Sequence, residues 1–87
     1  MTEKYQKLTP TELKIAKLRV LGLAYKEIAH DLNIVPKTVQ FHIRQIHTKL
    51  NVDSFGKLIW RMTELGLSPY NFKEEVKWNE LRERILL

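Results

Sequence analysis

Apolar residues recur at helical spacing along most of this chain, and signals that start or stop helices separate one group from the next. The densest start signal combines the capping hydroxyl of Thr9, Pro10 at the first helical position, and Glu12, whose carboxylate can reach back to the cap. It predicts a helix over residues 10–21, ended by Gly22 in the left-handed conformation. Since no segment shows strand-like alternation of useful length, we expect an all-α fold.

Three further helices are expected from the same kinds of signal. The second should cover residues 24–32 and the third residues 36–50, beginning at a proline that presets the backbone angle. The short connection 33–35 lets one helix cross the other closely. A fourth helix is predicted over residues 55–65, with Gly66 as its terminator. On the third helix the core-facing positions are Val39, Ile43, Ile46 and Leu50.

The 87 residues fit one compact domain with short additions at each end. Residues 1–7 are interpreted as a basic N-terminal arm and residues 8–67 as the domain itself. Residues 68–87 are interpreted as a linker followed by a helix from Phe72 to Leu87. Three roles stay open for this last helix: it could pack on the core, form a dimer contact, or dock on another protein.

A long stretch without a carboxylate gives the strongest indication of function. Residues 32–52 contain no acidic side chain, in a protein that has ten. The whole net charge of +5 lies in residues 1–66, so a polyanion would approach that part of the chain. The outward face of the third helix, which would suit a DNA major groove, carries Lys37, Gln40, Phe41, Arg44 and Thr48.

Several classes of function are disfavoured by what the sequence lacks. The chain has no cysteine, which excludes disulfides and thiolate metal sites, and its three histidines lack metal-ligand spacing. We expect no metal, no cofactor and no catalytic residues, and interpret His42 as a structural histidine bonded inside the domain. No apolar run approaches the roughly 20 residues that span a bilayer. We therefore expect a cytoplasmic protein that makes no membrane contact.

The motifs together resemble the LuxR-type (GerE-type) helix-turn-helix domain over roughly residues 8–67. The matching positions are Leu8-Thr9-Pro10, Glu12-Leu13, Gly22, Glu27-Ile28-Ala29, Leu32, Ile34, Thr38-Val39, His42, Ile46 and Lys49-Leu50. The resemblance implies a four-helix DNA-binding domain of a bacterial transcription regulator, here with an added C-terminal helix. It also implies that the third helix enters the major groove and that the fourth commonly forms a two-fold dimer contact.

The resemblance and the residue chemistry assign the same base-reading positions. Gln40 can pair with adenine, Arg44 with guanine, and Phe41 can contact a thymine methyl group. The residues around them are expected to contact the DNA backbone, which positions the helix without reading sequence. These backbone candidates are Lys26, Lys37, Thr38, Gln45, Thr48 and Lys49. Lys4 and Lys7 of the arm would add non-specific attraction.

The chain departs from the family pattern at the starts of three helices. Ala24 and Val35 stand where the family usually has a capping residue, and losing a cap costs about 1 kcal/mol. Phe55 stands where the family often has an arginine at the start of the fourth helix. These departures put one or two backbone contacts in question and leave the expected fold unchanged.

The leading hypothesis is a stand-alone, sequence-specific transcriptional regulator that binds double-stranded DNA as a homodimer. Since only the short arm precedes Leu8, we expect neither phosphorylation nor a small signal molecule to switch the chain directly. The alternative is a protein-interaction module that docks on RNA polymerase or another regulator and binds DNA only non-specifically. The candidate dimer residues are Leu58, Ile59, Met62, Trp78, Leu81 and Ile85.

Overall fold

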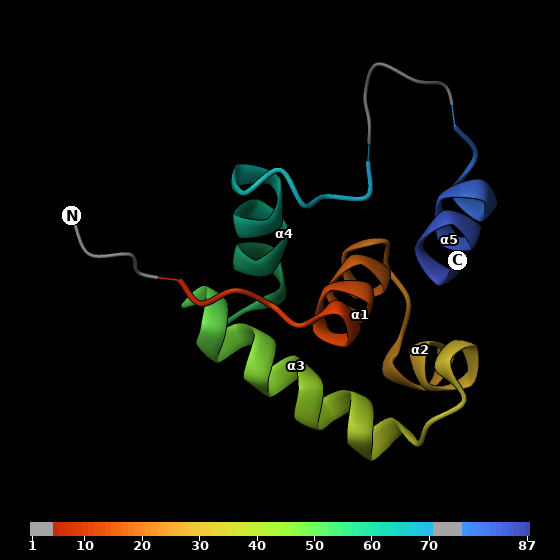
Figure 1. Ribbon diagram of the computed structural model, residues 1–87, viewed down its shortest axis with the longest axis horizontal. Coiled ribbons are helices and arrows are strands. Elements are labelled where there is room, and N and C mark those ends of the chain that lie inside the picture. The colour runs from red at the N-terminus through yellow and green to blue at the C-terminus, as the bar shows by residue number, and fades with distance from the viewer. Residues whose placement is uncertain (1–4, 71–75) are drawn as a thin grey trace.

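The computed structural model describes residues 5–70 and 76–87, and within these ranges the regular secondary structure consists of α-helices, without strands. This confirms the expected all-α fold with an added C-terminal helix. The elements, drawn in Figure 1, are α1 (Pro10–Val20), α2 (Tyr25–Leu32), α3 (Pro36–Leu50), α4 (Phe55–Glu64) and α5 (Trp78–Leu86). The first four agree with the predicted boundaries to within one residue. None of the described helices has the length and apolar character needed to span a membrane.

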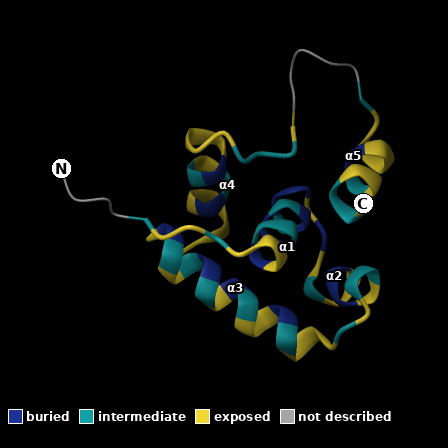
Figure 2. Cartoon of the chain, viewed as in Figure 1, coloured by how far each residue is buried: buried dark blue, intermediate teal, exposed yellow. Residues whose placement is uncertain are grey.

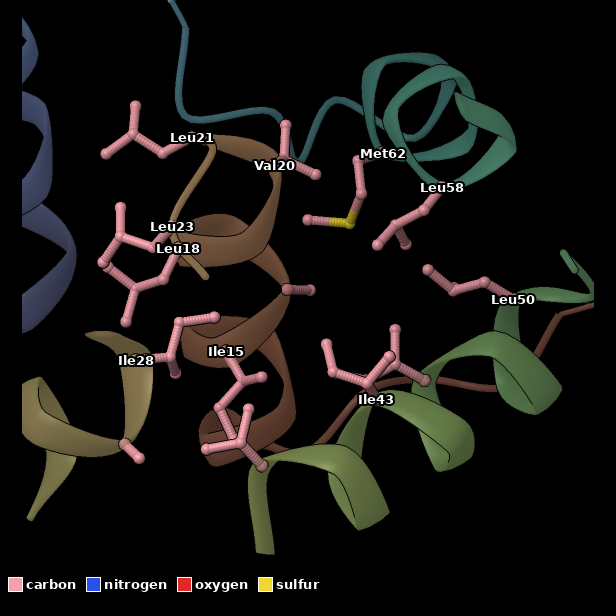
Figure 3. Packing of buried hydrophobic residues seen from close by; sticks show 14 of the residues in the cluster. Ile15, Leu18, Val20, Leu21, Leu23, Ile28, Ile43, Leu50, Leu58 and Met62 are labelled. Atoms are coloured by element: carbon pink, nitrogen blue, oxygen red, sulfur yellow. The ribbon is translucent and has the colours of Figure 1, made fainter. Parts of the chain in front are cut away.

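Helix α1 lies at the centre of the molecule and contacts each of the other four helices (Figure 1). Its side chains Ile15, Ala16 and Leu18 are fully buried. Figure 3 shows Ile43 of α3 and Leu58 of α4 pointing toward α1 from two sides. The predicted inward positions of α3, which are Val39, Ile43, Ile46 and Leu50, are all buried in this core.

The N-terminal cap of α1 forms as the sequence predicts. The Thr9 hydroxyl accepts a hydrogen bond from the Glu12 amide at 3.1 Å, and the Glu12 carboxylate accepts one from the Thr9 amide at 2.9 Å. Gly22 ends the helix with a φ of 105°. At the start of α2, where Ala24 offers no capping atom, the Glu27 carboxylate accepts from the Ala24 amide at 2.8 Å.

The Glu12 carboxylate also joins α1 to α3. Only 5% of Glu12 is exposed, and its Oε1 lies 2.6 Å from the Nζ of Lys49 near the end of α3. Burial acts to raise the pKa of Glu12, but the hydrogen bonds from Lys49 and Thr9 outweigh it, so the pKa lies below the usual 4.5. The carboxylate is therefore charged, capped and paired in the folded protein.

Tyr5 and Gln6 pack against α4 and the end of α3. The Gln6 amide donates to the Lys49 carbonyl oxygen at 2.8 Å. Arg61 of α4 donates to the Tyr5 hydroxyl at 2.5 Å, and its guanidinium carbon lies 4.2 Å from the centre of the Tyr5 ring. Residues 5 and 6 of the predicted arm are thus part of the folded body, and Lys4 lies outside the described residues.

Helix α5 begins at Trp78, later than the predicted start at Phe72, which lies outside the described residues. Val76 and Lys77 precede the helix outside regular secondary structure, and Lys77 has extended backbone angles. The helix packs on α1, where Leu81 is only 6% exposed. This arrangement favours the core-packing role among the three that the sequence left open.

Two polar contacts fix α5 against the body of the domain. The indole Nε1 of Trp78 donates to the Leu21 carbonyl oxygen at 2.9 Å. The guanidinium of Arg82 donates to both carboxylate oxygens of Asp31 in α2, at 2.7 and 2.5 Å. A two-pronged contact of this kind fixes orientation as well as distance.

Some of the predicted dimer residues are corrected by this packing. Leu58 and Met62 are fully buried between α4 and α1, and Leu81 is buried where α5 packs on α1, so in the folded chain these side chains are not available to a second molecule. The sequence identified the apolar side of each helix correctly. It could not show that the chain's own α1 covers both of those sides.

The stability of the fold should fall in acid because of Glu12. The unfolded chain binds the proton at a higher pH than the folded protein, so the contribution is present above pH 4.5 and is lost as the pH falls through the lower folded pKa. Glu12→Gln should lose about 1 to 3 kcal/mol at neutral pH and show a flatter pH dependence. Urea unfolding between neutral and acidic pH tests this. Glu83→Gln, an exposed control, should match the wild type, and an equal effect there would refute the assignment.

Breaking the contact between α5 and α2 should destabilise the protein measurably. Arg82→Gln leaves the Asp31 side chain, which is 8% exposed, without its charged partner, at a cost of about 1 to 3 kcal/mol. For a domain of this size, each kcal/mol lowers Tm by roughly 4 to 8 °C. Thermal unfolding of Arg82→Gln, Asp31→Asn and the double variant measures the coupling. Strictly additive effects would mean that the pair contributes nothing.

Candidate nucleic-acid interface

The outward side of α3 is the surface that the sequence predicted for DNA. Gln40, Phe41 and Arg44 are all exposed, and Phe41 keeps 57% of its surface accessible although it is a large apolar residue. Their spacing places them on adjacent turns of one side. In Figure 2 the buried side of α3 faces α1 and the exposed side faces away from the molecule. A major groove admits a helix presented in this way.

Most of the predicted backbone contacts surround this trio. Lys37 and Thr48 are exposed near the two ends of α3, and Lys26 is exposed in the first turn of α2. Thr38 and Gln45 are half-buried on the side of α3. Because α3 packs most extensively against α2, these residues occupy fixed positions relative to one another.

Lys49 forms a contact within the domain that the sequence did not predict. Its Nζ lies 2.6 Å from the Glu12 carboxylate, and the side chain is only 22% exposed. The Lys49 charge is therefore already compensated, and it holds α3 against α1. The sequence could not reveal this role, because Glu12 is 37 residues away along the chain.

The ion pairs among the described residues separate the cations into two groups. Lys49, Lys57, Arg61 and Arg82 each form an ion pair with a carboxylate. No such pair within residues 5–70 and 76–87 involves Lys26, Lys37 or Arg44. Pairing compensates the charge of the first group, whereas Lys26, Lys37 and Arg44 contribute uncompensated positive charge on and beside the exposed side of α3.

The two histidines of α3, His42 and His47, differ in their surroundings. His42 is half-buried, and its ring meets the Phe41 ring edge-on with centroids 5.8 Å apart. Among the described residues its ring forms this contact and no hydrogen bond, so the expected internal bond is absent there. Burial lowers the pKa of His47, the positive charge of Arg19 lowers it further, and Asp53 opposes both.

Sequence reasoning missed Arg19 as a residue of this region. It lies on the buried side of α1, four residues after Ile15, yet its guanidinium reaches aromatic rings at the starts of α2 and α4. The available signal was a charged residue at a position where the apolar stripe of the first helix predicts a hydrophobic one.

The outward side of α4 is exposed as well. Trp60 is 59% exposed, and Gly56 and Thr63 are exposed at spacings of four and three from it. These three residues share one side of the helix, opposite the buried Leu58 and Met62. An exposed large apolar side chain is typical of a contact surface, and the neighbouring glycine leaves room for another surface to approach closely.

Comparisons with known proteins agree with this geometry. Residues 6–62 match the family described as bacterial regulatory proteins of the luxR family. The matched segment covers α1 to α3 and most of α4, and it includes the entire exposed side of α3. No solved structure matches the chain significantly.

Similar curated proteins are bacterial regulators. The chain is 36% identical over 62 residues to the tetrathionate response regulatory protein TtrR of Salmonella typhimurium, covering 71% of this chain and 30% of that protein. It is 40% identical over 55 residues to the transcriptional regulatory protein UhpA of Escherichia coli, covering 63% of this chain and 28% of UhpA.

A third relative is the transcriptional regulatory protein FixJ of Azorhizobium caulinodans, 34% identical over 62 residues, covering 71% of this chain and 29% of FixJ. The chain thus spans less than a third of the length of each of these relatives. The family match covers more than half of the chain and contains the helices that form the exposed α3 surface. The chain therefore belongs to the luxR family of bacterial regulatory proteins and carries that family's helix-turn-helix domain.

Proposed function

We propose that this protein is a sequence-specific transcriptional regulator that binds double-stranded DNA as a homodimer in the bacterial cytoplasm, with α3 in the major groove. The observation that carries the proposal is the exposed side of α3, which presents Gln40, Phe41 and Arg44 on a helix that contains no carboxylate side chain. An exposed phenylalanine between two side chains that can form bidentate hydrogen bonds is suited to contact the edges of bases.

The three side chains differ in what they would recognise. The Arg44 guanidinium matches the two acceptors of guanine, and the Gln40 amide matches the donor and acceptor of adenine. The Phe41 ring suits the methyl group of thymine. Reading by three side chains on adjacent turns fits a short half-site, and a two-fold dimer would read two such half-sites.

The backbone contacts in this proposal are Lys26, Lys37, Thr38, Gln45 and Thr48. Lys26 and Lys37 supply charge, and the half-buried Thr38 and Gln45 supply hydrogen bonds from less mobile positions. Lys49 is omitted, because its charge is paired with Glu12. Each phosphate neutralised by a lysine or arginine steepens the log-log salt dependence of binding by roughly 0.9.

For the dimer we propose the outward side of α4, with Trp60 at its centre. Gly56 and Thr63 flank the indole, and Ile59 lies half-buried at the edge of this side. A two-fold contact places the same surface of both copies together, so an exposed tryptophan beside small residues suits it. Trp78 and Ile85 of α5 already contact their own chain, which leaves α4 as the better candidate.

Substitutions of Arg44 and Lys37 should have different effects on DNA binding, because the first residue is proposed to contact bases and the second the DNA backbone. Arg44→Ala should lose about 1 to 3 kcal/mol of preference for the selected sequence over random DNA, since it removes a base contact. Lys37→Ala should weaken binding to all DNA sequences alike and reduce the log-log salt slope of binding by about 1. Binding of a fragment selected from a random pool, titrated with random competitor, measures both effects.

The outcomes of that titration decide the function. Equal competition by any DNA would refute specific regulation and favour a protein-interaction module that binds DNA only non-specifically. Identical behaviour of Arg44→Ala and Lys37→Ala would refute the assignment of their roles. Lys77→Gln, an exposed change at the start of α5, is the control and should bind like the wild type.

Trp60→Ala should weaken the dimer on DNA. Truncating a central tryptophan of an interface costs at least about 2 kcal/mol, which is roughly a 30-fold loss of association. Sedimentation of the full chain with and without a two-half-site DNA fragment measures it over a concentration series. Leu87→Ala, which alters a fully exposed residue, is the control. A wild-type chain that stays monomeric on DNA would contradict the homodimer.

A further inference from the structure

Arg19 is held by three contacts, and none of the carboxylates in residues 5–70 and 76–87 forms an ion pair with it. Its Nη1 donates to the Leu23 carbonyl oxygen at 2.9 Å. The guanidinium carbon lies 4.2 Å from the centre of the Phe55 ring and 5.3 Å from the centre of the Tyr25 ring. None of the ion pairs within the described residues includes Arg19.

The contacts of Arg19 place its guanidinium between the starts of two helices. Tyr25 is the first residue of α2, next to the exposed Lys26, and Phe55 is the first residue of α4. The Arg19 charge also influences His47 of α3, which follows Arg44 by three residues and Gln40 by seven. Residues at those spacings share one side of a helix. His47 is thus on the side of α3 that carries Gln40 and Arg44, and the positive charge of Arg19 acts on that side.

We propose that Arg19 binds a phosphate of the DNA backbone, at the border of the surface presented by α3. The inference rests on the proposed DNA-binding function and adds a contact from α1, which otherwise serves as the core helix. A guanidinium has five donors, and the contact with Leu23 uses one of its nitrogens. The remaining donors form the planar fork that binds phosphate oxygens in pairs.

The two aromatic rings explain why an arginine suits this position. A guanidinium stacked on aromatic faces keeps its edge free for hydrogen bonds. The rings, together with the Leu23 contact, restrict the side chain before DNA arrives, so little rotational freedom remains to be lost on binding. An arginine without a carboxylate partner also keeps its full charge for the phosphate.

The salt dependence of DNA binding tests the proposal. Arg19→Gln should reduce the log-log salt slope of binding by about 0.9, the value for one phosphate. It should also lower the affinity for selected and for random DNA by the same factor. Arg19→Lys should keep most of the slope. Arg19→Gln combined with Phe55→Arg should restore it, since position 55 lies beside the Arg19 guanidinium. Lys77→Gln is the matched control for the loss of one positive charge.

Thermal unfolding of the same variants separates binding from a purely structural role. If Arg19→Gln lowers Tm but leaves the slope unchanged, Arg19 only stabilises the junction of α1, α2 and α4, and the proposal is overturned. If the double variant recovers the slope without recovering Tm, phosphate binding is supported directly. A wild-type protein that does not bind DNA would instead refute the proposed function, and that outcome is distinct from both.

Discussion

The packing of α1 against the other four helices is the interaction on which the rest of the structure depends. Ile15, Ala16 and Leu18 are fully buried, and burial of each large aliphatic side chain contributes about 1.5 to 3 kcal/mol. Because α2, α3 and α4 all pack on this one helix, it determines which side of α3 faces outward. In a chain of 87 residues the core is small, so each of these contacts carries a large share of the stability.

Polar contacts add to the apolar packing, and they determine which cations of the described residues are paired with a carboxylate. Glu12 caps α1 and neutralises Lys49, while Arg61 donates to the Leu50 carbonyl oxygen at 3.1 Å and pairs with Glu64. Within the described residues, every buried side-chain nitrogen or oxygen has a hydrogen-bond partner. Lys49, Arg61 and Arg82 thus have carboxylate partners, whereas Lys37 and Arg44 on the outer side of α3 form no ion pair with another described residue.

Much of the fold could be predicted because the relevant signals are local. The capping box at Thr9, the glycine at position 22 and the proline that opens α3 act on their own helix within a few residues. The predicted start of the last helix was less reliable. Helical composition continues through the segment before Trp78, but Val76 and Lys77 lie outside the helix. The contacts that hold the start of α5, such as the Trp78 hydrogen bond to Leu21, are tertiary and cannot be read from helical composition.

The candidate site was predictable to a similar degree. The spacing of Gln40, Phe41 and Arg44 follows from helix geometry alone, and their exposure agrees with it. The contacts of Lys49 with Glu12 and of Arg19 with Phe55 were not predictable, because each joins residues far apart in sequence. Leu58 and Met62 show the same difference: their apolar character was evident, but the surface that covers them was not.

The sequence by itself determined the helices, their apolar sides and the carboxylate-free outer side of α3, since these depend on residue type and on a period of 3.6 residues. Only the tertiary structure decided which cations are paired, which apolar sides are already covered, and that the Arg19 guanidinium lies beside the Phe55 ring. The physical reason is that charge compensation and burial depend on distances in space. Such distances are set by helix packing between residues that lie tens of positions apart.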